Sequence, residues 1–318
     1  MPEPHTLPAG PRRGRRIAAV SVGIVLACAS TAAFLTVRDS ASASTPDTAE
    51  AAAGAERRAA NPFLRAPGSP MTVIAHRGAS SAAPENTLVS DEVARRAGAR
   101  WIENDVQPSK DGVPYVLHDS TVDRTTDGTG PIRTLTAREL DRLDAGTWFA
   151  PAFRGLRIPT LAAQLADLRL RGGNLVLEIK GSHSRDQVAR IVEEVRDHGM
   201  ADRVLVQSFD PEALRHTRAL APELPLALLR DTLDPDPVAV ASELGLSAYN
   251  PAVGQLTAHP GTVEKLHAAG VAVMAWTVDT ADRWKTLDSL GTDAVITNRP
   301  AELAGWNAAW AQSRPTGS

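Results

Sequence analysis

Short apolar runs alternate with stretches of helical periodicity between residues 73 and 297, and this alternation limits the possible folds more than any other feature. Such a pattern is typical of a parallel sheet whose strands are joined by helices. Eight runs within one chain predict an α/β fold, a (β/α)8 TIM barrel, with an open doubly wound sheet as the alternative. No G-x-G-x-x-G follows the first run, which disfavours a dinucleotide-binding sheet. The expected strands are 73–76, 101–106, 174–179, 204–208, 226–229, 247–250, 271–276 and 294–297, and the clearest expected helices are 86–98, 185–198, 211–220, 262–269 and 280–290.

The N-terminus has the composition of an export signal. Four arginines between residues 12 and 16 precede residues 17–37, which carry no charge, and the small residues 40–44 follow. This three-part order predicts a secretory signal cleaved after Ala43. The apolar run is also long enough to span a bilayer, so retention as an anchor is the alternative. We therefore expect residues 1–43 to be a signal peptide or membrane anchor, and the protein to be secreted or extracytoplasmic, membrane-anchored if residues 17–37 are not cleaved.

Residues 44–70 are rich in Ala, Thr, Ser and Pro without apolar periodicity, which predicts a flexible linker before a folded domain at 71–318. The lone cysteine, Cys28, lies in the leader, so no intrachain disulfide or cysteine zinc site is expected. Lys and Arg number 34 against 37 Asp and Glu, a net charge of -3, which argues against a nucleic-acid partner. Membrane contact is expected only through an uncleaved N-terminal segment, and no feature indicates an oligomeric state.

Three carboxylates occur on two expected strands. Glu103 and Asp105 are two residues apart, so on a strand both point to the same face, and Glu178 ends the next expected strand. Carboxylates brought this close repel one another unless cations compensate them. Oxygen ligands suit Ca²⁺ or Mg²⁺, so the pattern predicts a site for one divalent cation. The alternative is that Glu103 and Asp105 form surface ion pairs.

Two histidines and an arginine fall where barrel enzymes place their active sites, at the carboxyl ends of strands. His76 and Arg77 end the first expected strand, and a hairpin-like insertion at residues 112–117 delivers His118 to the same end. Two histidines titrating near neutral pH can serve as base and acid for cleavage of a phosphodiester. Arg77 can donate two hydrogen bonds to a phosphate. Structural histidines and a surface arginine are the alternatives.

Six motifs together resemble the glycerophosphodiester phosphodiesterase family. They are HRGASSAAPENT (76–87), IENDVQPSKDGVPYVLHD (102–119), LEIK (177–180), QSFD (207–210), WTV (276–278) and TNRP (297–300). Their order and spacing match the family from about residue 73 to 303. The resemblance implies a TIM barrel that hydrolyses glycerophosphodiesters to sn-glycerol 3-phosphate and an alcohol with Ca²⁺ or Mg²⁺.

The resemblance also implies roles for single residues. His76 and His118 would be the acid/base pair, and Arg77 and Lys180 would contact the phosphate, with Trp276 lining the glycerol pocket. The metal ligands would be Glu103, Asp105 and Glu178. The glycerol 2-hydroxyl would be the internal nucleophile, giving a cyclic phosphate that water opens. Ca²⁺ is favoured over Mg²⁺ for an exported enzyme.

Some positions depart from the family pattern or have two interpretations. Asn104 and Asn298 stand where many members carry an apolar residue and an aspartate, and neither position is an expected metal ligand. Glu85 either orients an active-site partner or favours a helix N-terminus. The Trp306 and Trp310 pair is expected to pack on the barrel.

Two other functions compete with glycerophosphodiester hydrolysis. The first is a phospholipase D-like enzyme of the same fold that acts on intact lipids, although such enzymes carry a disulfide-bearing loop that this chain lacks. The second is a secreted binding protein without catalysis. The alcohol is not determined by the sequence, and a glycerol-phosphate wall polymer is among the candidate substrates.

Overall fold

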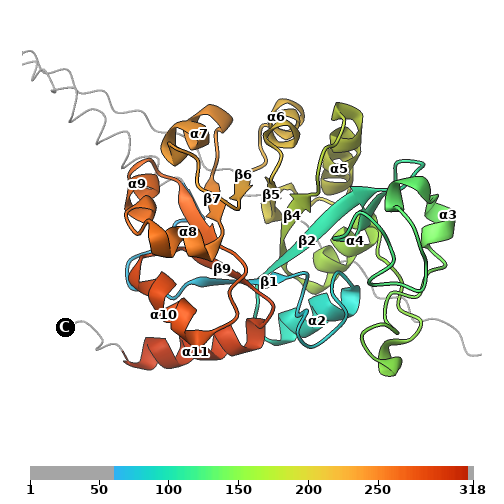
Figure 1. Cartoon of the computed structure of the whole chain (residues 1–318), viewed down its shortest axis with the longest axis horizontal. Coiled ribbons are helices and arrows are strands. Elements are labelled where there is room, and N and C mark those ends of the chain that lie inside the picture. Colours follow the sequence, from blue (N-terminus) through green and yellow to red (C-terminus); the bar gives the residue numbers. More distant parts are fainter. Residues whose placement is uncertain (1–60, 314–318) are drawn as a thin grey trace, which may run out of the picture. The chain divides into compact units, whose positions relative to one another are not determined.

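A computed structural model describes residues 61–313, in which eight parallel strands close into a barrel (Figure 1). The barrel closes because the first strand pairs with both the second and the last barrel strand: Ile74 lies opposite Trp101 on one side and Ile296 on the other. The expected TIM barrel is therefore confirmed over the open sheet. The barrel strands are β1 (Thr72–His76), β2 (Trp101–Pro108), β4 (Asn174–Ile179), β5 (Val204–Ser208), β6 (Leu226–Arg230), β7 (Ala248–Pro251), β8 (Ala272–Ala275) and β9 (Ala294–Thr297).

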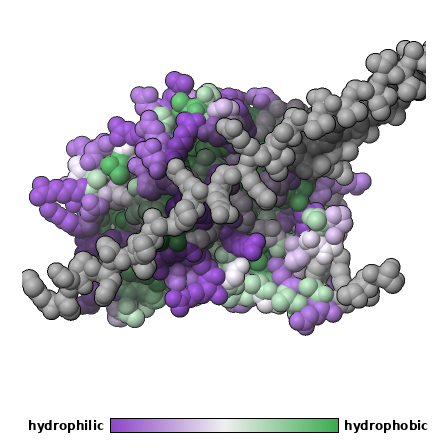
Figure 2. Space-filling view, turned by 180° about the vertical axis from the view of Figure 1, so that it is seen from behind, coloured by the Kyte–Doolittle hydropathy of each residue, from purple (hydrophilic) through white to green (hydrophobic). Residues whose placement is uncertain are grey.

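Helices surround the strands in Figure 1, and their sequences show why they form there. In α5 (Arg185–Asp197) the buried residues Val188, Ile191, Val192 and Val195 recur at helical spacing, and the Ser184 hydroxyl caps the first turn. The exposed faces of the helices carry polar residues, and hydrophilic side chains surround smaller hydrophobic areas on the coloured surface in Figure 2. The other helices are α2 (Leu88–Arg96), α4 (Leu161–Arg171), α6 (Pro211–Leu220), α7 (Pro237–Leu244), α8 (Val253–Ala258), α9 (Thr262–Ala268), α10 (Ala281–Ser289) and α11 (Pro300–Ser313).

The inside of the barrel is apolar in its middle and polar toward the carboxyl ends of the strands. Ile74, Val176 and Leu205 belong to a buried cluster of side chains contributed by the barrel strands. Strand geometry points every second residue to the same face, so the residues two positions further on, such as His76 and Glu178, point inward above this cluster. The polar residues therefore gather at the carboxyl end of the barrel.

An insertion between β2 and β4 adds a small core of its own. Strand β3 (Pro114–Val116) pairs antiparallel to the end of β2, as expected for a hairpin. The insertion then continues to Thr160 through η1 (Ile132–Thr134), α3 (Ala137–Leu140) and η2 (Pro151–Phe153), which the sequence did not predict. Its buried residues are Tyr115, Leu117, Val122, Ile132, Leu140, Ala145 and Ile158.

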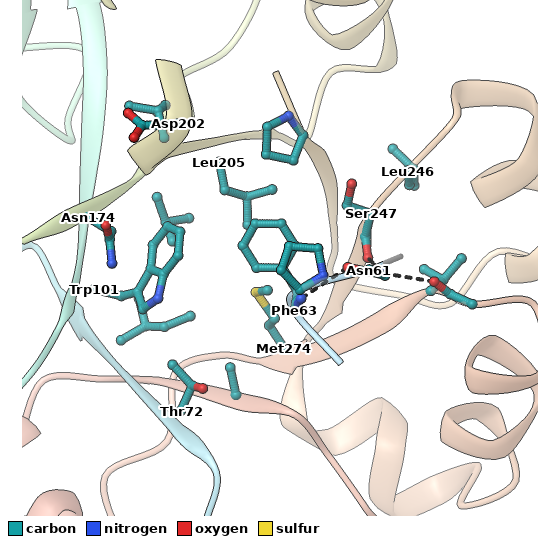
Figure 3. Close-up of a pocket in the computed structure, with 18 of the residues that line it drawn as sticks. Asn61, Phe63, Thr72, Trp101, Asn174, Asp202, Leu205, Leu246, Ser247 and Met274 are labelled. Carbon is teal, nitrogen blue, oxygen red and sulfur yellow. Dashed lines mark hydrogen bonds between the residues drawn. The ribbon is translucent and has the colours of Figure 1, made fainter. Parts of the chain in front are cut away.

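The opposite end of the barrel is covered by residues that the sequence assigns to the linker. The Asn61 side-chain amide donates hydrogen bonds to the carbonyls of Ser247 and Gly270, at 2.7 and 2.8 Å (Figure 3). The Phe63 ring lies 5.6 Å from that of Trp101. Asn61 and Phe63 belong to the lining of a pocket of about 670 Å³, which is otherwise formed largely by residues at the start of several strands. This pocket is therefore at the end of the barrel away from His76.

The predicted signal peptide or anchor lies outside the described residues. Among residues 61–313, no helix is both long enough and apolar enough to cross a membrane.

Asp91 forms a buried polar contact between α2 and α4 and is expected to make stability depend on pH. Its Oδ2 accepts a 2.7 Å hydrogen bond from Gln164, which in turn accepts one from Asn104 of β2. Burial raises the pKa of Asp91 from 3.8 to about 7. Between pH 3.8 and about 7, Asp91 is therefore ionised in the unfolded chain but protonated in the folded protein. The free energy of unfolding therefore falls by about 1.4 kcal/mol per pH unit as the pH rises.

We expect Asp91→Asn to remove this dependence. The stability of the variant relative to wild type should grow between pH 4 and 7 and level off above pH 7. Urea unfolding across this range measures the difference, and Asp186→Asn, at an exposed position on α5, is the control. A difference that does not change with pH would show that Asp91 is already ionised in the folded protein.

Candidate active site

Three carboxylates meet at the carboxyl end of the barrel. Glu103 and Asp105 of β2 and Glu178 of β4 each place a carboxylate oxygen within 4.8 Å of the others. Their side chains are buried, and Glu103 and Asp105 are only 1% exposed, which rules out surface ion pairs. Neighbouring amides orient them: Gln207 donates to Glu103 at 3.1 Å and Asn86 donates to Asp105 at 2.9 Å.

The charges of this cluster are only partly compensated. Lys180 Nζ lies 2.9 Å from Glu178 and 3.5 Å from Asp105, and Arg77 Nε lies 3.2 Å from Asp105. Burial and the neighbouring carboxylates raise the pKa of Glu103 well above its usual range and that of Glu178 to about 8. Burial also acts against ionisation of Asp105, but Arg77 and Lys180 hold its pKa low.

This arrangement fits a divalent cation. Two cations against three buried carboxylates leave negative charge in excess, and Asp105 Oδ1 is buried without a hydrogen-bond partner. An oxygen-only donor set of this kind suits Ca²⁺ or Mg²⁺. Glu103, Asp105 and Glu178 are thus the residues that would hold the ion.

The turn after β1 has an unusual backbone that aims Arg77 at the cluster. Arg77 and Asn86 have positive φ values of 55° and 56°, which non-glycine residues rarely adopt. As a result the Arg77 backbone N–H donates to Glu103 at 3.1 Å and its guanidinium faces Asp105. Gly78 also has a positive φ, and a Cβ there would lie 2.6 Å from the Ser90 backbone. The turn therefore requires glycine at this position.

His76 is oriented by Asn298. His76 Nδ1 lies 2.7 Å from Asn298 Oδ1, whose amide nitrogen donates to Asp279 at 2.7 Å. Because that nitrogen faces a carboxylate, the amide oxygen must face His76, and Nδ1 carries the proton. Nε2 then points to the carboxylates, 4.0 Å from Glu103. Burial, together with the charge of Arg77, lowers the pKa of His76 to about 4.

Asn298 is therefore more important than its sequence position indicates. It is not a metal ligand, but it contacts an expected catalytic histidine. The aspartate expected at this position from the family pattern would give His76 a charged partner. In this chain the partner is the neutral amide of Asn298, and the negative charge lies on Asp279, which hydrogen-bonds to Asn298.

His118 is held by a second set of contacts. It follows Leu117, whose N–H donates to the Asp105 carbonyl, so the hairpin brings it beside the cluster. His118 Nδ1 lies 2.7 Å from Asp119 Oδ1, which leaves Nε2 free. The Asp119 carboxylate also accepts hydrogen bonds from Arg124.

Glu85 contacts two arginines near the carboxylate cluster, as the interpretation in which it orients an active-site partner requires. It accepts hydrogen bonds from Arg77 at 2.9 Å and from Arg124 at 2.8 Å. Burial opposes its ionisation, but hydrogen bonds from Arg124 and the charge of Arg77 hold its pKa below the usual range.

The last expected site residue, Trp276, forms one wall of this region. Its ring meets that of Phe209 edge to face at 5.3 Å, and its indole N–H donates to the Asn250 carbonyl at 2.7 Å. Lys180 Nζ lies 5.9 Å from the centre of the Phe209 ring. An aromatic wall is thus connected to the cationic side of the cluster. Trp306, by contrast, packs against Trp284, as expected for a structural residue.

The structure brings all eight expected site residues to one end of the barrel. It also adds residues that the sequence reasoning missed as partners, namely Asn86, Arg124, Gln207, Phe209, Asp279 and Asn298. Several lie inside the quoted motifs, so the only signal for them was their position in PENT, QSFD or TNRP.

Comparisons with known proteins agree with this geometry. Residues 76–302 match the model of the glycerophosphoryl diester phosphodiesterase family. A glycerophosphodiester phosphodiesterase of Caldanaerobacter subterraneus subsp. tengcongensis is 35% identical over 233 residues, covering 73% of this chain and 95% of that protein.

Solved structures show the same similarity. A glycerophosphodiester phosphodiesterase from Agrobacterium tumefaciens superposes with a TM-score of 0.66 and 34% identity, covering 74% of this chain and 99% of the other. An Oleispira antarctica phosphodiesterase in complex with the product sn-glycerol-3-phosphate superposes with a TM-score of 0.71 and 32% identity, covering 75% and 96%.

Proposed function

The chain belongs to the glycerophosphodiester phosphodiesterase family and is a phosphoric diester hydrolase, and from this premise we propose how its own residues cleave the substrate. The substrate is a small glycerophosphodiester, and the products are sn-glycerol 3-phosphate and an alcohol. The product bound in the Oleispira antarctica structure supports this substrate class. The observation that carries the proposal is the placement of two independently oriented histidines beside one cluster of three buried carboxylates.

Arg77 and Lys180 bind the phosphoryl oxygens in this proposal. Both cations already lie at the edge of the carboxylate cluster, within 3.5 Å of Asp105. Trp276, supported by Phe209, packs against the carbon chain of the glycerol. A divalent cation held by the three carboxylates neutralises charge on the phosphoryl oxygens when bound. Ca²⁺ is favoured over Mg²⁺, because we propose that the enzyme acts outside the cytoplasm, where Ca²⁺ is abundant.

His76 is the general base of the first step. Its lowered pKa keeps the ring neutral at pH 7, and the proton on Nδ1 leaves Nε2 free to accept another. Nε2 takes the proton of the glycerol 2-hydroxyl, and that oxygen attacks the phosphorus. The new P–O bond closes a cyclic phosphate while the bond to the alcohol breaks.

His118 is the general acid of the same step. Its Nδ1 is occupied by Asp119, so Nε2 is the nitrogen that donates a proton to the departing alkoxide. Water then opens the cyclic phosphate with the roles of the two histidines reversed. An internal nucleophile makes the first step effectively unimolecular, so in this proposal the enzyme recognises the glycerol rather than the alcohol.

The N-terminal leader supports a secreted or extracytoplasmic location, with membrane anchoring if residues 17–37 are retained. A glycerol-phosphate wall polymer would be an accessible substrate at that location. No nucleic-acid partner is proposed, given the net charge of -3.

Product analysis of the purified protein tests the proposed function. With Ca²⁺ or Mg²⁺ we expect release of sn-glycerol 3-phosphate from glycerophosphocholine. Release of choline or phosphocholine from intact lipid, without release of sn-glycerol 3-phosphate from glycerophosphocholine, would support a phospholipase-type enzyme instead. No release from either substrate or from wall polymer would support a binding protein.

A further inference from the structure

Arg124 lies in the insertion between β2 and β4, beyond β3, and contacts two carboxylates at once. Its Nε and Nη2 donate to Asp119 at 2.6 and 3.1 Å. Its Nη1 and Nη2 donate to Glu85 at 2.8 Å each. All three guanidinium nitrogens are therefore used in two forked ion pairs.

Each of these carboxylates has a second partner among the proposed catalytic residues. Asp119 holds His118 Nδ1 at 2.7 Å, and Glu85 holds Arg77 Nη1 at 2.9 Å. Arg77 in turn contacts Asp105, a proposed metal ligand. A continuous series of side-chain contacts, in which carboxylates alternate with nitrogen groups, thus runs from His118 to the carboxylate cluster.

This arrangement connects two segments that are separate in the fold. Glu85 belongs to the turn after β1, whereas Asp119 and Arg124 belong to the insertion after β2. Asp119 and Glu85 are both carboxylates that only accept hydrogen bonds when ionised, so neither can bind the other directly. Within residues 61–313, their connection therefore passes through the guanidinium of Arg124.

A structural role alone does not account for this geometry. The Arg124 side chain is 44% exposed, and ion pairs at such positions contribute little to stability. Two bidentate forks fix orientation, however, because a planar guanidinium permits few other geometries. Hydrogen bonds from Arg124 hold the pKa of Asp119 below its usual range, and those to Glu85 act in the same direction, so both carboxylates stay ionised at neutral pH.

We propose that Arg124 is a positioning residue that aligns the general acid His118 and the phosphate-binding Arg77 together, through Asp119 and Glu85. The inference rests on the proposed function and extends it. In this role the partly exposed Arg124 side chain does not contact the substrate. It fixes the positions of His118 and Arg77 relative to each other.

Substitution of Arg124 should reduce catalysis without unfolding the protein. We expect Arg124→Ala to lower kcat on the order of 10- to 100-fold, since small displacements of catalytic groups have effects of this size. KM should rise as well, because Arg77 loses part of its support. Arg124→Lys should recover only a small part of the loss, as one ammonium cannot form two forks. The matched control is Arg154→Ala, at an exposed position in the same insertion, with unchanged kcat and KM.

Two further measurements separate positioning from a structural role. Added guanidinium at low millimolar concentration should partly restore kcat of Arg124→Ala and leave Arg154→Ala unaffected. The effects of Glu85→Gln and Asp119→Asn on kcat should be non-additive when Arg124 is present and additive in the Arg124→Ala background. Thermal unfolding of each variant verifies that it is folded at the assay temperature.

The outcomes distinguish failure of the inference from failure of the proposed function. An active wild type whose kcat and KM are unchanged in Arg124→Ala, or additive effects of the two carboxylate variants with Arg124 present, would overturn the inference alone. A wild-type protein that releases no sn-glycerol 3-phosphate from any glycerophosphodiester would overturn the proposed function, and the inference with it.

Discussion

Chelation of divalent cations is expected to abolish release of sn-glycerol 3-phosphate, and added Ca²⁺ or Mg²⁺ is expected to restore it. The reason is the carboxylate cluster, in which burial and the neighbouring carboxylates raise the pKa values of Glu103 and Glu178, and Arg77 and Lys180 offset this only in part. The assay follows product formation from glycerophosphocholine after EDTA treatment and after titration with each cation.

A stability measurement tests the same site without using activity. Ca²⁺ should raise the Tm of wild type, because an ion that binds only the folded state stabilises it. Asp105→Asn should remove this shift, whereas Asp186→Asn, at an exposed position on α5, should keep it. The ion must displace protons from acids such as Glu178, with a pKa of about 8, so its apparent affinity should rise with pH up to that value. Full activity after exhaustive chelation, with a Tm insensitive to both cations, would show that the cluster does not hold a catalytic ion.

Replacement of His76 or His118, the proposed base and acid, is expected to lower kcat by on the order of 100- to 10,000-fold, the usual contribution of a positioned acid or base. The two variants should differ in their dependence on the leaving group. A p-nitrophenyl ester of glycerol phosphate releases a stable phenolate that needs no proton. The first turnover, which releases nitrophenolate, should therefore stay fast in His118→Ala on this ester, although the second step still needs His118 as its base. His76→Ala should be impaired in the first turnover on both substrates because the base of that step is missing.

The control for both variants is His259→Ala, at an exposed position after α8, which should behave as wild type. Equal losses in the first turnover on the two substrates for His118→Ala would contradict its role as the acid of that step. Selective recovery of His76→Ala on the nitrophenyl ester would show that the two roles are exchanged.

The barrel strands were predictable because their signals are local. Apolar runs such as residues 174–179 and 204–208 coincide with β4 and β5, and the periodicity of residues 211–220 coincides with α6. The spacing of Glu103 and Asp105 likewise places both carboxylates on one face of β2, since strand geometry alone decides which residues share a face.

The insertion was less predictable. Only its hairpin has a regular pattern, and the rest consists of short helical turns around a small core of its own. Irregular segments of this kind have no repeating spacing of apolar residues to detect. The contacts of Asn61 and Phe63 with the base of the barrel were missed for the same reason, since a polar segment with one aromatic residue resembles a linker.

The sequence by itself determined the (β/α)8 fold, the order of its elements and the set of residues that could carry phosphodiester chemistry. Tertiary structure alone decided how those residues are oriented. His76 meets Asn298 because barrel closure places β9 beside β1, although the two residues are 222 positions apart. Arg124 meets Glu85, 39 positions away, because the insertion folds back over the turn after β1. Propensity and periodicity act over a few residues, whereas hydrogen bonds between distant side chains form only once the barrel has closed.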